Sequence, residues 1–375
     1  MRFVIATRRL RSPGGAETFV LTLAEALAQL GHEIVLFSNE LGLVAEEASR
    51  RALIVTSDLS QLPREIDATI SLDRAHAIDL ARIYPKAVRL YAMQNTLEQD
   101  LPPPEPGIVT ATIAPNTRFE ILARGCVGAG DVIRIRQPID ILRYSPRGFA
   151  KAVPTDVLYV GNYSLAEGQR LAQLQEAWGD FGLRWHYLGR PTPTLNVAKA
   201  IAQVDIVVGY GRSILEAMSC GRPAYVHEHS GSDGWVTAAN YTKLEADGFA
   251  GSALRTHPDV ATLRADFASY SPDYGRIGQD LVRMHHDAKM VAADLVHRIS
   301  ALASPSVEYD ASALYGLRRL VESHARAEER AEKYRTEAKA AVALWKIVNL
   351  PARLMYKAKR RAHMLRRKLL GATNR

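Results

Sequence analysis

Cysteine is scarce in this chain, with only Cys126 and Cys220 among 375 residues. Two isolated cysteines exclude a disulfide framework and the paired-cysteine motifs of structural zinc sites. The run from His227 to His229 offers no substitute, because adjacent residues of an extended segment point to opposite faces. We therefore expect a reducing compartment and predict no metal or other cofactor.

Long apolar runs are also missing. The opening stretch MRFVIATRRL holds too few apolar residues before its two arginines to form the core of a signal peptide. No later stretch approaches the roughly 18 apolar residues of a membrane-spanning helix. We expect a cytoplasmic protein.

Acidic residues are absent after Glu337, although the remaining 38 positions hold 11 of the 48 basic residues. Residues 1–337 therefore combine 37 basic with 40 acidic residues, a net charge of −3, against +8 for the whole chain. The basic character belongs to the C-terminal tail.

Short apolar segments typical of buried strands alternate with segments of helical period. The first group comprises RFVIAT, HEIVLFS, DATISL, AVRLYAM and IVTATIAP, and the second comprises TDVLYVGNY, LRWHYLG and VDIVVGYG. This alternation predicts parallel strands with crossover helices. The stretch RQPIDILRYSPRGFAKAVP between the groups reads as a linker.

The predicted fold class is α/β, with two Rossmann-like, doubly wound domains that face a central cleft. We place an N-terminal acceptor domain at 1–147, a C-terminal donor domain at 148–303 and a helical extension at 304–375. The extension would begin with a long charged helix over 311–345 and end in the basic tail.

Each domain has a glycine turn between a strand and a helix. Gly14 and Gly15 form the first turn, and Gly209 and Gly211 form the second, which leads into Arg212. Glycine lets the backbone approach a ligand closely, and a helix N-terminus favours an anion. The sequence predicts an anionic ligand here. The alternative is that these glycines serve only tight turns.

Three segments resemble the GT-B-fold glycosyltransferases, especially the retaining glycosyltransferase family 4. They are PGGAETFVLTLAEALAQLGHEIVLFS, the interdomain RQPIDILRYSP and VVGYGRSILEAMSCGRPAYV. The resemblance covers roughly residues 1–300 and leaves the tail outside. It implies a nucleotide-sugar bound by the C-terminal domain and an acceptor bound by the N-terminal domain.

The resemblance is uneven in the donor segment. Family members carry two glutamates separated by seven residues; Glu216 matches the second, but Val208 stands at the first position. The family's donor loop holds an arginine and a lysine facing the diphosphate, where this chain has Asn162 and Glu167. A glutamate repels a diphosphate, so the positive charge must come from elsewhere.

Arg212 and Arg190 are the candidate replacements. A guanidinium at the start of a helix can pair bidentately with phosphate oxygens, and Ser213 would lie beside it. The alternative for Arg212 is a structural salt bridge. The resemblance implies that Glu216 binds the ribose hydroxyls, and the alternative there is pairing to a nearby arginine.

Two further places are candidates for substrate contacts. His76 follows a predicted strand, where it would orient the transferring sugar or the acceptor hydroxyl; a solvated histidine is the alternative. The stretch HEHSGSDGWVT places Gly231, Asp233 and Gly234 beside the expected nucleotide-sugar, with a plain surface loop as the alternative. No carboxylate pair indicates an inverting base.

The tail admits three interpretations. Leucines, Met355 and Trp345 are interleaved with the basic residues, as in a helix lying on an anionic membrane face. The cations expected at the headgroups are Lys357, Lys359, Arg360, Arg361, Arg366, Arg367 and Lys368. Nucleic-acid binding is the disfavoured rival, and a solvated tail or a partner-docking helix is the third possibility.

The sequence therefore leaves two functional hypotheses. One is a glycosyltransferase, retaining by resemblance, that uses a nucleotide-sugar and a lipid-linked acceptor at the inner face of a membrane, in cell-surface polysaccharide or glycolipid assembly. The other is a GT-B-like protein without turnover that binds a sugar nucleotide or a partner. The departures at Val208, Asn162 and Glu167 support the second hypothesis.

Overall fold

The computed structural model describes residues 1–94, 103–146, 148, 150–161, 165–189, 193–228, 231–255, 257–303 and 309–348. The chain divides into two compact units, Met1–Arg318 and Arg319–Arg375. Across these described ranges, no helix combines the length and apolar character needed to cross a membrane.

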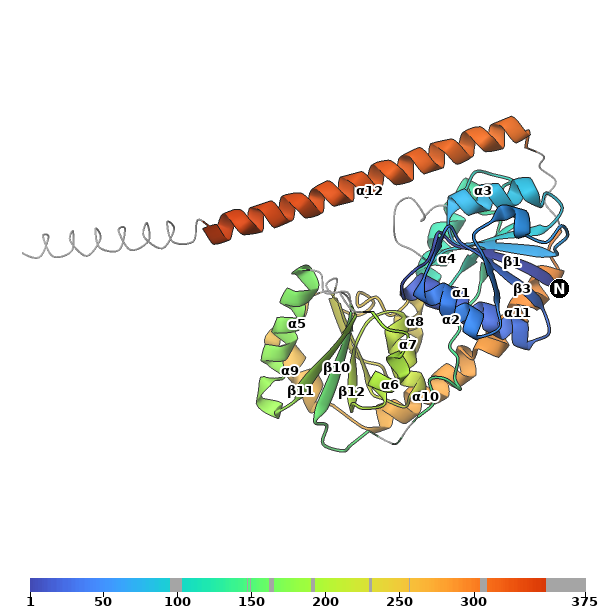
Figure 1. The fold of residues 1–375 in the computed structure, drawn as a ribbon. Coiled ribbons are helices and arrows are strands. Elements are labelled where there is room, and N and C mark those ends of the chain that lie inside the picture. The colour runs from blue at the N-terminus through green and yellow to red at the C-terminus, as the bar shows by residue number, and fades with distance from the viewer. Residues whose placement is uncertain are drawn as a thin grey trace, which may run out of the picture. The chain divides into compact units, whose positions relative to one another are not determined.

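The first Rossmann-like domain is built on a seven-stranded parallel sheet with the order β5-β3-β1-β6-β7-β8-β9 (Figure 1). Its strands are β1 (Arg2–Ala6), β3 (Glu33–Phe37), β5 (Ile54–Thr56), β6 (Ala68–Ser71), β7 (Val88–Ala92), β8 (Ala111–Ala114) and β9 (Asp131–Arg134). The crossover helices are α1 (Gly15–Gln29), α2 (Leu43–Arg50), α3 (Arg74–Ile83) and α4 (Thr117–Arg124). A small separate pair, β2 (Arg9–Leu10) and β4 (Glu40–Leu41), joins two of the loops.

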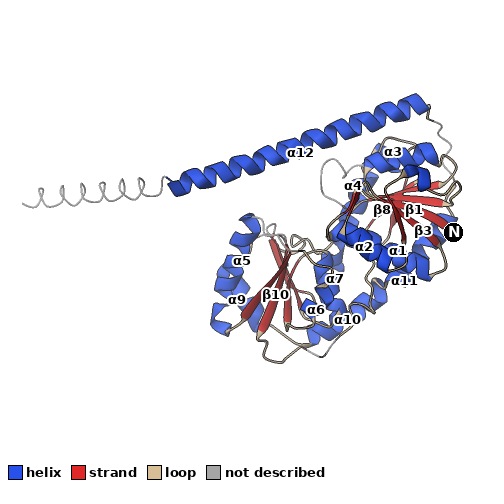
Figure 2. Cartoon of the chain, viewed as in Figure 1, coloured by secondary structure: helices blue, strands red, loops and turns tan. Residues whose placement is uncertain are grey.

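The second domain has a five-stranded sheet with the order β11-β10-β12-β13-β14 (Figure 2). The strands are β10 (Asp156–Gly161), β11 (Arg184–Gly189), β12 (Ile206–Gly209), β13 (Ala224–Glu228) and an antiparallel edge strand, β14 (Gly231–Trp235). Its helices are α5 (Leu165–Ala177), α6 (Val197–Ile201), α7 (Arg212–Ser219), α8 (Tyr241–Ala246), α9 (Val260–Ala268) and α10 (Asp273–His285). The predicted α/β class with two Rossmann-like domains is confirmed.

Strand alternation explains the two layers of the second core. Val157 and Tyr159 of β10 face Trp178 and the α5–α9 side, while Leu158 packs with α7 on the opposite side. Both faces of a parallel sheet are covered in this architecture, so its strands read as nearly continuous apolar runs.

The helix α11 (Ala288–Ser300) lies within the range predicted for the second domain but packs on the first. Val291 and Leu295 belong to the same buried cluster as Leu23 and Leu27 of α1. The chain thus returns to the N-terminal domain after α10. Apolar periodicity could not predict this return, because it indicates which face of a helix is buried but not which domain that face packs against.

Polar contacts also join the two domains. Arg134, at the end of β9, binds both carboxylate oxygens of Glu245 in α8, at 2.6 and 2.7 Å. The buried His286 ring contacts the Gln137 carbonyl through Nδ1 and the Tyr241 hydroxyl through Nε2, each at 2.8 Å. Burial lowers the pKa of His286 to about 3, so this ring stays neutral at physiological pH.

The long helix α12 (Ala311–Val348) spans the predicted range 311–345. Its first turns are anchored on the first domain, because Leu314 is buried and Arg318 pairs with Asp79 of α3 at 2.8 Å. The basic tail beyond residue 348 lies outside the described residues.

Candidate functional site

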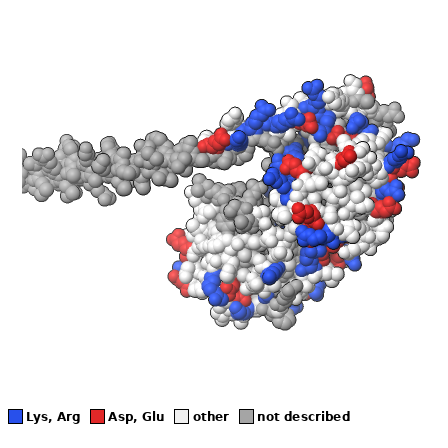
Figure 3. Space-filling model, in the orientation of Figure 1, with Lys and Arg blue, Asp and Glu red and all other residues white. Residues whose placement is uncertain are grey.

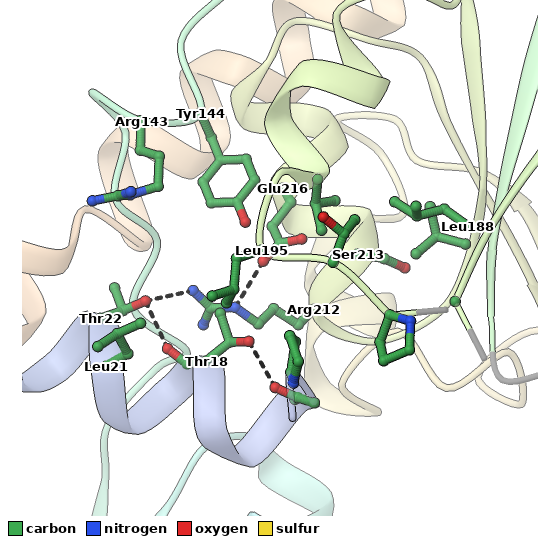
Figure 4. A pocket seen from close by; sticks show the side chains of 18 of the residues that line it. Thr18, Leu21, Thr22, Arg143, Tyr144, Leu188, Leu195, Arg212, Ser213 and Glu216 are labelled. Atoms are coloured by element: carbon green, nitrogen blue, oxygen red, sulfur yellow. Dashed lines mark hydrogen bonds and ion pairs between the residues drawn. The ribbon is translucent and has the colours of Figure 1, made fainter. Parts of the chain in front are cut away.

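One pocket in the first unit collects the glycine turns of both domains (Figure 4). It lies where β10, β11 and β12 end, and the N-terminal half of α1 forms the opposite wall. Ligands of open α/β sheets bind at this carboxyl edge of the strands. The residues that line it include Gly14, Gly15, Thr18, Thr22, Arg143, Tyr144, Val160, Gly161, Leu188, Gly189, Tyr210, Arg212, Ser213 and Glu216.

The ends of β10 and β11 approach each other at two glycines. Gly189 has φ +141°, and a Cβ there would lie 1.7 Å from the Gly161 carbonyl oxygen. No other residue fits this close approach. The floor of the pocket is consequently bare backbone at these strand ends.

The second glycine turn sets the start of α7. Gly211 is the N-cap residue, with φ 58° and ψ −132°, a backbone conformation that favours glycine. The first turn of α7 contains no acidic residue. Ser213 donates its hydroxyl to the Tyr210 carbonyl at 2.8 Å, which fixes the turn. The positive end of this helix therefore borders the pocket with no acidic residue in its own first turn.

Arg212 occupies the centre of the pocket, and its guanidinium has three partners. Nε donates to Glu216 and Nη2 to the Thr22 hydroxyl, each at 2.9 Å (Figure 4), and Nη1 donates to the Pro138 carbonyl at 2.8 Å. These partners lie in α7, the linker and α1. Arg212 thus ties the second domain to the first through a side chain only 8% exposed.

Glu216 is the buried carboxylate of the pocket, with 6% of its side chain exposed. Burial raises its pKa, while the Arg212 guanidinium and a hydrogen bond from the Tyr144 hydroxyl oppose that rise. Tyr144 is buried beside this carboxylate, and burial together with the charge on Glu216 raises its pKa as well. The group that the resemblance assigns to ribose binding is thereby held by an arginine and a tyrosine.

The start of α1 differs in charge from the start of α7. Gly14 is its N-cap, but Glu17 stands in the first turn, and a Cβ on Gly14 would lie 2.4 Å from its Oε2. Thr18 donates its hydroxyl to the Gly14 carbonyl at 2.7 Å, and Thr22 donates to the Thr18 carbonyl at 2.8 Å. The α1 residues that line the pocket include the hydroxyls of Thr18 and Thr22, while Glu17 stands in the first turn outside the lining.

Five of the predicted site residues line the pocket together: Gly14, Gly15, Arg212, Ser213 and Glu216. Gly209 ends β12 and Gly211 caps α7, so both belong to the turn that carries Arg212. Val208 is fully buried within β12, where it packs with the aromatic core.

His76 is buried at the start of α3 and does not line this pocket. Its Nδ1 lies 2.6 Å from Asp73 Oδ2, its backbone N–H donates to Asp73 Oδ1 at 3.0 Å, and its ring meets Phe37 edge-on. Burial opposes ionisation of Asp73, but the contacts with His76 lower the pKa of this carboxyl. Within the described ranges the buried His76 Nε2 has no hydrogen-bond partner.

The structure does not bring Gly231, Asp233 and Gly234 into the pocket. They form the edge strand β14, and the Asp233 carboxylate accepts backbone N–H groups of residues 253–255 at 2.7 to 3.1 Å. A buried carboxylate satisfied by three amides organises the following loop. The pattern of glycines around an acid indicates this turn chemistry as readily as a ligand contact.

Several predicted positions fall outside the described residues: Arg190, Asn162 and the seven tail cations Lys357, Lys359, Arg360, Arg361, Arg366, Arg367 and Lys368. Glu167 lies in α5, and its side chain is not among those described. The contributions predicted for these residues stay predictions.

Sequence reasoning missed an ion-pair network on the rim of the pocket. Arg51 binds Glu25 at 2.8 Å and Glu47 at 2.9 Å, and Arg143 approaches Glu25 at 3.4 Å and Asp140 at 3.1 Å. Arg143 belongs to the linker RQPIDILRYSP, whose resemblance to the family signature could have indicated it, whereas no motif in the sequence indicates Arg51. The part of the chain that the structure describes holds no cluster of His, Cys, Asp or Glu suited to a metal ion.

No protein-family model matches the sequence, and the comparison with curated proteins gives no match. Solved structures share the fold. HepE from Anabaena, in complex with UDP and glucose, is 15% identical with a TM-score of 0.57, over 80% of this chain and 100% of that one. A glycosyltransferase from Rickettsia africae is 11% identical, with a TM-score of 0.52 over 80% and 98% of the two chains.

An alpha-glucosyltransferase in complex with UDP and a 13-mer DNA containing an HMU base is 9% identical. Its TM-score is 0.54, and the match covers 80% of this chain and 99% of that one. Two of these three solved structures are named as glycosyltransferases, and each of the three matches covers 80% of this chain. The chain has the GT-B fold of glycosyltransferases.

Proposed function

We propose that this protein is a glycosyltransferase that takes a sugar from a nucleotide-sugar held by the second domain. One observation carries the proposal: the glycine turn at the start of α7, whose first helical turn contains no acid, presents Arg212 and Glu216 at the carboxyl edge of the second sheet. HepE, which shares the fold, is described in complex with UDP and glucose and with UDP-glucose. The same class of donor suits this pocket.

In the proposed complex the diphosphate lies at the α7 N-terminus. Its oxygens accept backbone N–H groups there, and the fixed positive end of the helix stabilises their charge. Arg212 is close enough to exchange its neutral acceptors, the Thr22 hydroxyl and the Pro138 carbonyl, for phosphate oxygens, which make stronger charge-assisted bonds. Glu216, kept in place by Tyr144, would bind the ribose hydroxyls.

The chemistry we propose is a retaining transfer, as the resemblance implies. The bond between the anomeric carbon of the sugar and the diphosphate breaks, and the acceptor oxygen forms a new bond to that carbon on the same face. The leaving diphosphate takes the proton of the acceptor hydroxyl. No general base is needed, which agrees with the absence of a carboxylate pair in the described lining of the pocket. Positive charge at α7 stabilises the leaving group.

The acceptor is proposed to be lipid-linked, because the basic and apolar tail would hold the enzyme at an anionic membrane. Each cation near such a surface contributes about 1 kcal/mol, and the attraction weakens with salt. We expect the full chain to sediment with vesicles containing anionic lipid but not with neutral vesicles. A chain ending at Glu337 should sediment with neither and keep its nucleotide affinity.

Tight binding of the full chain to duplex DNA or RNA at low salt, without binding to anionic vesicles, would replace the membrane interpretation with nucleic-acid binding. Retention of vesicle binding by the shortened chain would instead locate the membrane contact within residues 1–337, in the two Rossmann-like domains or the first part of α12. Both results would leave the glycosyltransferase assignment standing.

The second candidate function is a GT-B-like protein that binds a sugar nucleotide without turnover. The Arg212–Glu216 pair favours it, because the two side chains proposed to hold the donor satisfy each other within one helix. Such a pair is satisfied without a ligand and opposes exchange of its partners for a phosphate.

Calorimetry with a panel of nucleoside diphosphates, followed by mass spectrometry of sugar nucleotides after incubation, separates the two candidates. A transferase should bind one diphosphate and slowly release it from the matching sugar nucleotide, with water acting as acceptor. Binding without hydrolysis, and without transfer to lipid-linked acceptors, would support the second candidate. Absence of binding to every diphosphate would refute both.

A further inference from the structure

We propose that α12 forms an antiparallel coiled coil with α12 of a second copy of this chain. The observation behind this is a seam of residues spaced alternately by three and four positions along the helix. In the described side chains it runs through Leu317, Leu320, His324, Ala327, Ala331 and Tyr334 and continues to Ala338. The same spacing reaches residues 341, 345 and 348, which are alanine, tryptophan and valine in the sequence.

This spacing is the heptad pattern that keeps one helix face against a partner. It extends from residue 317 to the end of α12 at Val348, which exceeds the three to four heptads typical of a coiled coil. Every seam position except His324 is apolar. Leu320 and Tyr334 are nevertheless 66% and 67% exposed. A single chain therefore leaves this face open to water along the described part of the helix.

Side-chain size selects the register of the proposed pair. The seam alternates between two kinds of heptad position, a and d. In an antiparallel coiled coil, each a position faces a d position of the partner helix. The register that places Ala331 opposite Tyr334 of the second copy puts Ala327 opposite Ala338 and His324 opposite residue 341, an alanine. Large side chains thus meet small ones around the centre. The ends then pair leucine with valine or tryptophan, so the complete seam is covered.

Charge selects the antiparallel orientation. The described flanking residues Arg330 and Glu337 are exposed, and the register above brings Arg330 of each copy beside Glu337 of the other. A parallel pair would instead place Arg330 beside residue 335 of its partner, which is also an arginine. Figure 3 shows Lys and Arg side chains along the described part of α12, so a mismatched orientation would face strong repulsion.

The test uses the full chain and measures its mass by sedimentation velocity over a range of concentrations at low and high salt. The expected species is a dimer, with twice the 41.4 kDa of one chain. Arg330→Glu should weaken dimerisation roughly tenfold at low salt, because it turns two attractive contacts per dimer into repulsive ones. Glu337→Arg should do the same, and the double variant Arg330→Glu/Glu337→Arg should restore wild-type association.

Arg326→Glu is the matched control, with the same change of charge on the outer face of the same helix. It should leave the dimer unchanged, and far-ultraviolet circular dichroism should show that all variants keep their helix. A wild-type chain that stays monomeric would overturn the proposal, including the case in which the tail covers the seam of its own chain. Stronger association of Arg330→Glu would overturn it in favour of a parallel pair, and unchanged association would locate the interface elsewhere.

Discussion

The two glycine turns of the pocket are similar in sequence and different in electrostatics. At α1, Gly14 precedes a first turn that contains Glu17, and the nearby Thr18 and Thr22 offer only hydroxyls. At α7, Gly211 precedes a first turn without an acid, and Arg212 adds a cation. Both turns approach the same pocket, yet only the second has a first turn without an acid, and its cation Arg212 is paired with Glu216 further along the same helix.

The difference shows that a glycine turn before a helix lets a ligand approach the backbone closely, and that the neighbouring charges decide which kind of ligand binds there. A carboxylate in the first turn already complements the positive end of its helix. The α1 turn is therefore suited to a neutral group such as a sugar hydroxyl, and the α7 turn to a diphosphate. Four single substitutions test this assignment.

The largest effect is expected for Arg212→Ala. It leaves Glu216 buried without its cation and removes the tie to Thr22, so the free energy of unfolding should fall by about 3–5 kcal/mol. Nucleoside diphosphate binding should weaken by about 1.5–3 kcal/mol, the range for hydrogen bonds to charged groups. Chemical denaturation measures the first quantity and calorimetry the second.

A double variant separates the structural contribution of Arg212 from its contribution to binding. Replacing the pair together, as Arg212→Met with Glu216→Leu, removes the uncompensated charge and should recover most of the lost stability. Nucleotide affinity should stay low. A double variant that regains both stability and affinity would show that Arg212 contributes to stability and not to nucleotide binding.

The intermediate effect is expected from alanine at the two turns. Gly211→Ala places a side chain at φ 58° and should cost roughly 1–3 kcal/mol of stability. Gly15→Ala has no atom within 4 Å of its new Cβ and replaces glycine at a helical position, so it should be neutral or stabilise by up to about 1 kcal/mol. Equal costs in thermal unfolding would contradict the difference between the turns.

The α/β class, the paired Rossmann-like domains and the long helix could be predicted from the sequence, because buried parallel strands and amphipathic helices leave distinct apolar periods. The sequence has no comparable signal for which element packs against a given buried face. The packing of α11 on α1 and the tie between Arg134 and Glu245 join residues far apart in the chain. Such contacts depend on how the domains meet.

The site was predictable to the extent that its residues are local. Arg212 and Glu216 are four residues apart on one helix, so both a phosphate contact and a mutual salt bridge could be proposed, and the structure shows the salt bridge. Tyr144 and Thr22 reach this pair from the linker and from α1, and no spacing in the sequence relates them. For Asp233 the local pattern of glycines around an acid predicted a ligand contact, but its carboxylate accepts backbone N–H groups of the following loop.

The smallest effect is expected for Glu17→Gln, which removes the carboxylate that distinguishes α1 from α7. Loss of its favourable position at the helix start should reduce stability by about 0.3–1 kcal/mol. Nucleoside diphosphate binding should strengthen by at most a similar amount at low salt, because one negative charge leaves the start of the helix that borders the pocket. Glu46→Gln, in the first turn of α2, a helix none of whose residues line the described pocket, is the matched control and should change stability alone. If the two variants bind the diphosphate equally, with the affinity of the wild type, the charge at the α1 turn has no influence on the anion, and the contrast between the two turns reduces to their backbone geometry.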